Sequence, residues 1–234
     1  MSIPTFQQLF DYDTWTYTYL LANPDTKDAV IIDPVVEQTE RDLTLLNELG
    51  LRLRTILDTH IHADHVTGAA ALREATGATY ALGAVSGLPC ADTLLDDGQV
   101  IPFGDQNIVA LATPGHTDES MCYLFGDRVF TGDTLFVRST GRTDFQNGST
   151  QDLWDSITNK LFTLPDETLV YPAHDYQGRT ATTIGDEKRL NVRAGLGHDY
   201  AAFAQVVDQA QKGKPLPGRV KVALPANRNC GVTD

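Results

Sequence analysis

Apolar residues along the first part of the chain either alternate with polar ones or form short unbroken runs, which is the pattern of β-strands. The stretch WTYTYLL (15–21) alternates aromatic or aliphatic side chains with threonine, and AVIID (29–33) is a short buried run that ends at Pro34. Between residues 36 and 49 the apolar positions recur at helical spacing, and Gly50 supplies a C-terminal stop. This part of the sequence therefore predicts two strands of a first sheet, followed by a helix.

The next segment predicts a strand that leads directly into a group of histidines. RTILDTH (54–60) has the composition of a buried strand. Residues 64–76 contain strong helix formers and end before Gly77, so they are expected to form a helix. The stretch THIHADHVTG (59–68) is therefore expected on a loop between this strand and this helix.

Strand and helix patterns alternate through the rest of the chain. The turn at Gly126-Asp127 predicts a hairpin between two of the later strands. Because the two kinds of element are intermixed, we expect an α/β fold with sheets covered by helices, in one domain over 1–234 with a short helical and coil segment from about residue 186. The expected strands are 107–113, 121–125, 128–133 and 168–174, and the expected helices are 151–162, 186–194 and 200–211.

Composition narrows the class of protein. With 234 residues and 41% hydrophobic side chains, the chain is long enough to bury a substantial core. It contains no apolar run near the roughly 18 residues of a membrane span. A formal charge of −13 repels phosphate backbones and anionic lipid surfaces, so neither nucleic acid nor a membrane is expected as a partner.

The cysteines indicate where the protein resides. Cys90, Cys122 and Cys230 are an odd number at irregular spacing, so we expect reduced thiols. We expect a soluble protein of the bacterial cytoplasm, or of the mitochondrial matrix if the chain is eukaryotic and already processed.

Four expected strands share one feature, because each is followed at once by a histidine or an aspartate. Carboxyl ends of neighbouring strands meet at one edge of an open sheet, so these side chains are expected to converge. Five of the six histidines of the chain occupy such positions. The four places are TILDT-HIHADH, with His60, His62, Asp64 and His65, and the stretches that end in His116, Asp133 and His174.

The spacing within the histidine group predicts a metal site. In an extended loop His60 and His62 point the same way and can reach one ion, whereas Asp64 and His65, at the expected helix start, aim at a second point. Asp133 could bridge the two. Imidazole and carboxylate suit zinc, iron or manganese, and the spacing alone leaves open whether one ion is bound or two.

These motifs resemble the signature of the metallo-β-lactamase superfamily, H-x-H-x-D-H followed by further histidine and aspartate ligands. The resemblance implies an αββα sandwich of two mixed β-sheets flanked by helices. It also implies a first metal position at His60, His62, His116 and Asp133 and a second at Asp64, His65, His174 and Asp133. All seven residues are present, so a dinuclear hydrolase such as glyoxalase II remains an alternative.

Three other stretches resemble the persulfide dioxygenases of this superfamily, namely 131–149, 161–176 and 225–232 (PANRNCGV). The resemblance implies one Fe(II) per chain, held by His60, His116 and Asp133. Two histidines and one carboxylate leave three coordination positions open, enough for oxygen and a substrate sulfur. His62, Asp64, His65 and His174 would then lie around the iron and orient its ligands or water.

The same resemblance implies a reaction in sulfide oxidation, in which O2 and water convert glutathione persulfide to sulfite and glutathione. Because glutathione carries two carboxylates, cations are expected near its binding site. Arg142, Arg138 and Arg228 are the candidates, and Tyr176 is a candidate to bind a peptide carbonyl. For each arginine a structural ion pair is the alternative role, and Asp144 is expected to be a turn or salt-bridge residue.

Two other functions remain as alternatives. A glyoxalase II-like thioester hydrolase with two metals fits the ligand set, although only 60 residues follow His174 to form the helical extension of that enzyme. A non-enzymatic metal-binding protein would have no need for open coordination positions. The sequence leaves open whether the chain forms a homodimer and whether a sulfurtransferase supplies the substrate. Asp33 is expected to brace the loop beneath the metal.

Overall fold

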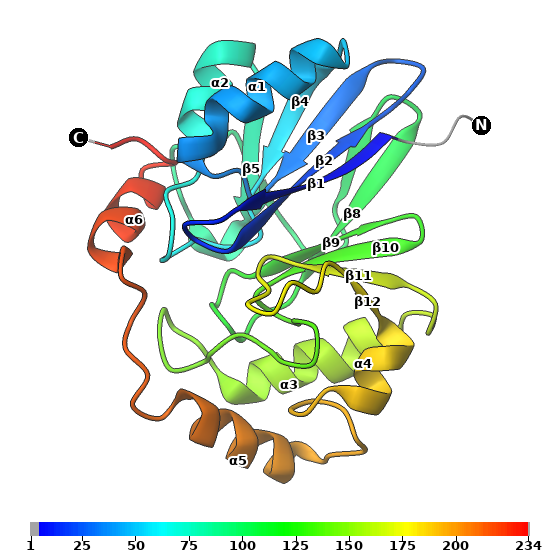
Figure 1. The fold of residues 1–234 in the computed structure, drawn as a ribbon, viewed down its shortest axis with the longest axis vertical. Coiled ribbons are helices and arrows are strands. Elements are labelled where there is room, and N and C mark those ends of the chain that lie inside the picture. The colour runs from blue at the N-terminus through cyan, green and yellow to red at the C-terminus, as the bar shows by residue number, and fades with distance from the viewer. Residues whose placement is uncertain (1–4, 234) are drawn as a thin grey trace. The chain divides into compact units, whose positions relative to one another are not determined.

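The computed structural model describes residues 5–233, which form two compact units (Figure 1). The first unit consists of the residues up to 95, of 100–108 and of the residues from 216 on, and the second consists of 96–99 and 109–215. Within 5–233, no helix combines the length and the apolar composition that crossing a membrane requires. The expectation of a single domain over 1–234 stays a prediction.

The first unit is built on a mixed six-stranded sheet. Its first three strands pair antiparallel and the remaining strands pair parallel. The predicted strands 15–21 and 29–33 are confirmed, whereas the two edge strands and the strand at Thr79–Gly83 were not predicted, and the strand expected over 54–60 ends at Leu57. The order is β1 (Thr5–Asp11), β2 (Thr16–Ala22), β3 (Asp28–Ile32), β4 (Arg52–Leu57), β5 (Thr79–Gly83) and β6 (Thr93–Leu95).

Helices of the first unit pack on the core of this sheet. Leu20, Ile31, Ile56 and Leu72 are among its buried residues. The helix expected from Asp64 begins only at Ala69, so Asp64 and His65 lie in the preceding loop. The helices are η1 (Val36–Gln38), α1 (Thr39–Glu48), α2 (Ala69–Thr76), η2 (Ala84–Ser86) and α6 (Val220–Asn227).

The second sheet is also mixed, and its register positions the later candidate residues. β9 and β10 form the hairpin predicted at Gly126-Asp127, and β10 pairs parallel with β11. Gly132 lies opposite Pro172, so Asp133 and His174 follow the ends of two adjacent parallel strands. The order is β12 (Thr182–Thr183), β11 (Leu169–Pro172), β10 (Arg128–Gly132), β9 (Met121–Phe125), β8 (Gln106–Ala112) and β7 (Val100–Phe103), of which β7 and the start of β8 belong to the first unit.

Helices of the second unit begin at polar caps, as their sequences suggest. The Ser149 side chain accepts a hydrogen bond from the Asp152 amide, and Asp199 caps the last helix of the unit in the same way. Leu153, Ile157 and Phe203 bury their side chains in one core. The predicted helices over 151–162, 186–194 and 200–211 correspond to α3 (Thr150–Asn159) with η3 (Leu161–Thr163), α4 (Ile184–Leu190) and α5 (Tyr200–Gln211).

The expectation of three reduced cysteines is wrong for two of them. Cys90 and Cys230, which are 140 positions apart in sequence, form a disulfide with their Cα atoms 6.0 Å apart. Residue spacing carries no information about a contact this distant along the chain, which is why the pattern gave the wrong expectation. Cys122 is a buried thiol beside the Thr113 hydroxyl, at 3.2 Å.

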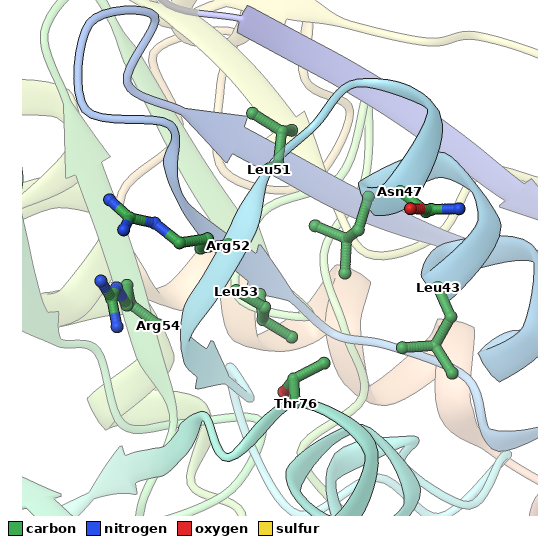
Figure 2. A pocket seen from close by; sticks show the side chains of 8 residues that line it. Leu43, Asn47, Leu51, Arg52, Leu53, Arg54 and Thr76 are labelled. Carbon is green, nitrogen blue, oxygen red and sulfur yellow. The ribbon is translucent and has the colours of Figure 1, made fainter.

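A pocket of about 350 Å³ lies in the first unit beside α1 and β4 (Figure 2). Its apolar lining comes from leucines of these two elements. Arg52 and Arg54 at its edge are held by Asp28, at 3.4 and 2.7 Å. None of the residues predicted for metal or substrate lines this pocket, so we assign it no part in the candidate site.

Asp42 of α1 makes the stability of the fold depend on pH. Its side chain is 1% exposed, and burial raises its pKa from 3.8 to about 6, although Arg41 opposes the rise. The folded protein therefore holds this proton more tightly than the unfolded chain does. The stabilisation is complete below about pH 4 and is lost as the pH rises through about 6.

We expect the Asp42→Asn variant to lack this dependence, because the amide resembles the neutral acid and carries no buried charge. It should be more stable than the wild type at pH 7 by about 3 kcal/mol. Urea unfolding at about pH 4 and pH 7 measures the difference. Asp152→Asn, an exposed carboxylate in the first turn of α3, is the control. A parallel loss of stability in the wild type and in Asp42→Asn would contradict the assignment.

Candidate metal centre

The loop that connects β4 to α2, residues 58–68, carries the histidine group and is called the histidine loop below. Asp33, at the end of β3, fixes its first part by accepting hydrogen bonds from the Thr59 amide at 2.7 Å and from the Thr59 hydroxyl at 2.9 Å. The Thr59 hydroxyl therefore has its proton directed at Asp33, and it accepts from His60 Nδ1 at 3.1 Å. This confirms that Asp33 braces the loop.

These hydrogen bonds also set the tautomer of His60. Because Nδ1 carries the proton that is donated to Thr59, the lone pair is on Nε2. His60 is 2% exposed. Histidine typically binds a metal as a neutral imidazole whose other ring nitrogen donates a hydrogen bond to a neighbour. The hydrogen bond from Nδ1 of His60 to Thr59 gives this form, with Nε2 available to a metal.

The other side chains of the loop form a second set of candidate ligands. His62 Nε2 lies 3.1 Å from Asp33 Oδ1, and His65 Nδ1 lies 3.0 Å from Asp64 Oδ2. Burial lowers the pKa of His65, but the carboxylates of Asp64, Asp58 and Asp33 together outweigh burial, and the pKa lies above its ordinary value. Each of His62, Asp64 and His65 offers a ligand atom within 4.8 Å of the others, so this group could hold an ion.

Two buried carboxylates, Asp33 and the first residue of the loop, Asp58, attach the histidine loop to its sheet. Burial raises the pKa of Asp33 and raises that of Asp58 to about 7. Asp58 accepts hydrogen bonds from the Tyr80 hydroxyl at 2.7 Å and from the Thr67 hydroxyl at 3.1 Å. The loop is therefore attached to its own sheet by buried polar contacts at both ends.

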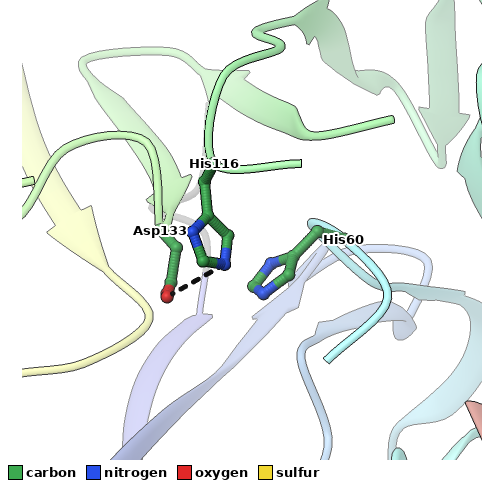
Figure 3. Close-up of side chains that lie close together, drawn as sticks. All are labelled: His60, His116 and Asp133. Atoms are coloured by element: carbon green, nitrogen blue, oxygen red, sulfur yellow. Dashed lines mark ion pairs between the residues drawn. The ribbon is translucent and has the colours of Figure 1, made fainter. Parts of the chain in front are cut away.

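In the second unit, His116 has its tautomer set in the same way as His60. Its Nδ1 donates to the carbonyl of Arg142 at 2.8 Å, so its lone pair is on Nε2. This Nε2 lies 3.5 Å from Asp133 Oδ2, as the dashed line in Figure 3 marks. A separation of 3.5 Å exceeds the 2.7–3.2 Å of a good hydrogen bond.

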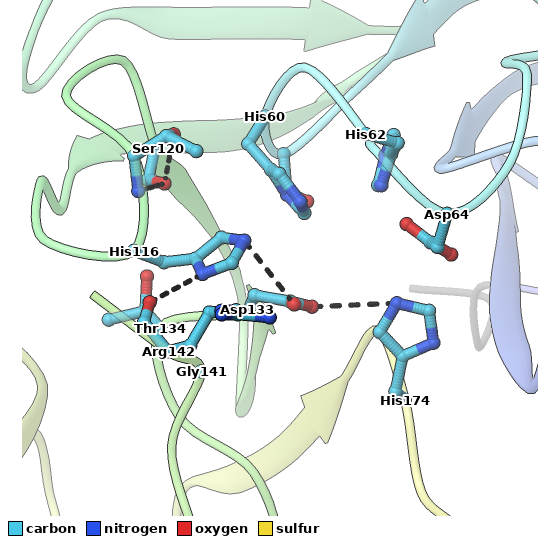
Figure 4. Close-up of polar contacts among 12 residues, drawn as sticks. His60, His62, Asp64, His116, Ser120, Asp133, Thr134, Gly141, Arg142 and His174 are labelled. Carbon is cyan, nitrogen blue, oxygen red and sulfur yellow. Dashed lines mark hydrogen bonds and ion pairs between the residues drawn. The ribbon is translucent and has the colours of Figure 1, made fainter. Parts of the chain in front are cut away.

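Asp133 has a carboxylate oxygen that is available to a cation. Its Oδ1 is buried and has no hydrogen-bond partner among residues 5–233. His174 Nε2 lies 3.6 Å from this oxygen (Figure 4). A carboxylate flanked by two imidazoles at these distances is costly to bury without a positive charge beside it. The nitrogen and oxygen donors of the second unit therefore fit a zinc, iron or manganese ion.

Gly141 is required by the close approach of its backbone to both candidate ligands. Its amide donates to the Asp133 carbonyl at 2.8 Å. A Cβ at this position would lie 2.3 Å from that carbonyl oxygen and 2.9 Å from His116 Nδ1. Any larger residue would displace His116 or Asp133, so the glycine of the GRTDF stretch fixes the geometry of the site.

Two of the predicted glutathione contacts are engaged elsewhere within the second unit. Arg138 pairs with the buried Glu187, and Arg142 pairs with Asp144 through two hydrogen bonds of 2.6 and 3.0 Å. The hydrogen bonds from Arg142 lower the pKa of Asp144, which confirms Asp144 as a salt-bridge residue. Both arginines therefore have the structural ion-pair role that was expected as the alternative to glutathione binding.

The other two predicted glutathione contacts face solvent. Tyr176 is 64% exposed, and its ring stacks on that of His174 with centroids 6.0 Å apart. Arg228 is exposed and follows α6 directly. The structure thus brings His60, His62, Asp64 and His65 together in the first unit, and His116, Asp133 and His174 together in the second.

Sequence reasoning missed two residues that support the candidate ligands. Asn227 binds the backbone of the histidine loop. Arg193 is half-buried and donates to the Thr140 carbonyl at 2.8 Å, next to Gly141, and burial lowers its pKa. The PANRNCG stretch was a signal for Asn227, whereas nothing in the pattern around Arg193 distinguished it.

Comparisons with known proteins show the family to which this chain belongs. The model of the metallo-β-lactamase superfamily matches residues 16–174. A mitochondrial persulfide dioxygenase, ETHE1 of Bos taurus, is 42% identical over 97% of this chain and 88% of the relative, and the human protein is 41% identical over the same shares.

Two solved structures are similar to this chain in both sequence and fold. ETHE1 from Myxococcus xanthus is 51% identical, covers 97% of this chain and 100% of its own, and has a TM-score of 0.93. TTHA1623 in a di-iron-bound form is 29% identical over 81% of this chain and 98% of its own, with a TM-score of 0.64. The predicted fold class, two mixed sheets flanked by helices, is confirmed.

Proposed function

Because this chain belongs to the metallo-β-lactamase superfamily and, within it, to the persulfide dioxygenases, we propose that it oxidises glutathione persulfide. One persulfide, one O2 and one water give one glutathione, one sulfite and two protons. The observation that carries the proposal is the 42% identity with a persulfide dioxygenase over 97% of the chain.

The metal of the proposal is one Fe(II) per chain, held by His60, His116 and Asp133, the three side chains drawn in Figure 3. The tautomers of the two histidines support it, because each directs its Nδ1 proton to an oxygen and leaves its lone pair on Nε2. The buried Asp133 Oδ1 supports it as well. When bound, ferrous iron with these ligands supplies open positions for O2 and for the persulfide sulfur.

The remaining histidines have positions that are set by the protein itself. Asp33 holds His62 at 3.1 Å and Asp64 holds His65 at 3.0 Å. His174 Nε2 lies 3.6 Å from Asp133 Oδ1. We therefore assign His62, Asp64, His65 and His174 to the orientation of ligands and water around one iron, rather than to a second metal.

Metal analysis of protein purified without oxygen tests the proposal, together with oxygen uptake on glutathione persulfide and hydrolysis of lactoylglutathione. One iron per chain with oxygen uptake is the expected result. Two metals with thioester hydrolysis would favour the dinuclear alternative, for which the group His62, Asp64 and His65 is present. Neither activity would favour a metal-binding protein without catalysis.

Substrate binding by Tyr176 and Arg228 gives a separate prediction. We expect Arg228→Met and Tyr176→Phe to raise KM for glutathione persulfide about tenfold, since each removes one hydrogen-bonding group from the substrate. The value of kcat should stay within about twofold. Arg189→Met, an exposed arginine that pairs with Asp186, is the control. An unchanged KM in both variants would contradict the binding of glutathione persulfide by Tyr176 and Arg228.

The substrate chemistry also indicates what surrounds the protein in the cell. Glutathione persulfide forms by transfer of sulfur to glutathione, so a sulfurtransferase is the class of enzyme that would supply it. We propose the mitochondrial matrix for a eukaryotic chain or the bacterial cytoplasm for a bacterial one, a proposal that rests on the likeness to a mitochondrial relative, because the Cys90–Cys230 disulfide removes the argument from reduced thiols. Neither nucleic acid nor a membrane surface is proposed as a partner. Light scattering would determine whether the chain forms a homodimer.

A further inference from the structure

Asn227, the last residue of α6, contacts the histidine loop at three backbone groups. Its Oδ1 accepts from the Thr67 amide at 2.9 Å, and its Nδ2 donates to the carbonyls of His62 and His65, each at 2.8 Å. The side chain is 2% exposed. One amide therefore satisfies a buried donor and two buried acceptors of a loop that lies at least 160 residues away in sequence.

Gly231, which follows Asn227 closely in the chain, packs against the same loop. A Cβ on Gly231 would lie 2.6 Å from the Thr67 carbonyl oxygen, so only glycine fits at this contact. Cys230, between these two residues, is 1% exposed and forms the disulfide with Cys90. We call residues 225–231 the C-terminal clamp.

The other attachments of α6 are weak. The connection that leads to it is exposed over residues 212–216. Apart from Asn227, the buried side chains of the helix are the small ones of Ala223 and Ala226, and the Arg219–Glu37 ion pair is exposed at 39% and 42%. Small buried surfaces and exposed ion pairs contribute little to stability. The disulfide is therefore the strongest restraint on the position of Asn227.

We propose that Asn227 is a positioning residue for the histidine loop and that the Cys90–Cys230 disulfide keeps it in place, so that reduction by a dithiol loosens the loop and weakens metal binding. The part about the loop rests on contacts within the first unit. The part about metal rests on the proposed function.

The redox step is a thiol–disulfide exchange with a small dithiol. Its thiolate attacks the sulfur of Cys90, which is half-buried, and the Cys230 thiolate leaves and takes up a proton. The second thiol of the reagent then displaces Cys90 from the mixed disulfide. Two electrons and two protons pass to the protein, and the dithiol becomes a cyclic disulfide.

In the full-length protein, two variants of Asn227 distinguish the contribution of its Oδ1 acceptor from that of its Nδ2 donor. Asn227→Leu removes all three hydrogen bonds, so the Thr67 amide of the metal-free protein should exchange its hydrogen about tenfold faster. Asn227→Asp keeps the acceptor, so protection of Thr67 should persist. Zinc affinity should fall about tenfold in both variants, because the carbonyls of His62 and His65 lose their donor. Asn229→Leu, an exposed neighbour, is the matched control.

The role of the disulfide is tested by measuring hydrogen exchange of the same Thr67 amide. Treatment of metal-free wild type with dithiothreitol should accelerate Thr67 exchange, and Cys90→Ser should show the faster rate without any reductant. Dithiothreitol should have no further effect on Cys90→Ser, which shows that the reagent acts through this disulfide. Measuring metal-free protein avoids chelation of the metal by the dithiol.

The outcomes distinguish this inference from the proposed function. Wild type that binds no zinc or iron would overturn the metal proposal and the metal part of this inference, whereas the exchange rate of Thr67 would still test the loop contacts. Unchanged exchange and unchanged zinc affinity in Asn227→Leu would overturn Asn227 as a positioning residue. Exchange that is insensitive to dithiothreitol and to Cys90→Ser would overturn the role of the disulfide.

Discussion

The Gly141→Ala variant is expected to lose at least about a hundredfold in iron affinity, the larger end of what mispositioned ligands cause. The added methyl group would lie 2.3 Å from the Asp133 carbonyl oxygen and 2.9 Å from His116 Nδ1. Since the first contact is with backbone, the strain must be relieved by moving the loop that orients His116. Metal analysis after dialysis against buffered Fe(II) measures the effect.

Gly218→Ala is the matched control for this variant, because a Cβ there meets no atom within 4 Å. Circular dichroism establishes whether each variant is folded. If Gly141→Ala unfolds, zinc affinity of the milder Arg193→Lys variant tests the same loop, since Arg193 donates to Thr140 beside Gly141. Full iron binding by folded Gly141→Ala would contradict the role of this loop.

His60→Ala and Asp64→Asn are expected to differ in a way that reports the number of metals. His60→Ala removes a proposed iron ligand, so iron affinity should fall at least about a hundredfold. Asp64→Asn leaves the proposed ligands intact. It should bind iron within about twofold of the wild type, while kcat falls on the order of tenfold because His65 loses its carboxylate partner.

Iron content and kcat of both variants are measured on protein prepared without oxygen. Asp152→Asn, an exposed carboxylate of α3, controls for the loss of a charge. Equal loss of metal from His60→Ala and Asp64→Asn would indicate that two metals are bound and would support a dinuclear hydrolase.

Sequence patterns identified the candidate ligands because strands that end in a histidine or an aspartate position those residues by topology. The β10–β11 pairing puts Asp133 and His174 after adjacent strand ends, as the TGD and PAH stretches suggested. The tautomers of His116 and His60 could not be predicted from the sequence, because they depend on hydrogen bonds to the Arg142 carbonyl and the Thr59 hydroxyl. Side-chain distances, rather than spacing, decide which nitrogen can bind a metal.

The errors have physical causes in contacts between distant residues. The helix expected from Asp64 starts at Ala69 because the backbone groups it would need are engaged elsewhere, the His65 carbonyl with Asn227, the Val66 carbonyl with the Val36 amide and the Gly68 amide with the Pro34 carbonyl. Helix propensity cannot compete with three such contacts. Helix α6 itself was missed because it contains Pro225 and few large apolar residues. The role of the PAN stretch becomes visible only when the histidine loop is placed beside it.

The ratio of O2 consumed to sulfite formed is the most direct test of the proposed function. Iron-loaded protein is mixed with limiting glutathione persulfide in a sealed oxygen electrode, and sulfite and glutathione are quantified afterwards. We predict one O2 consumed for each sulfite and each glutathione formed, with no consumption by His60→Ala. Absence of O2 uptake by fully iron-loaded protein would contradict the assignment as a persulfide dioxygenase.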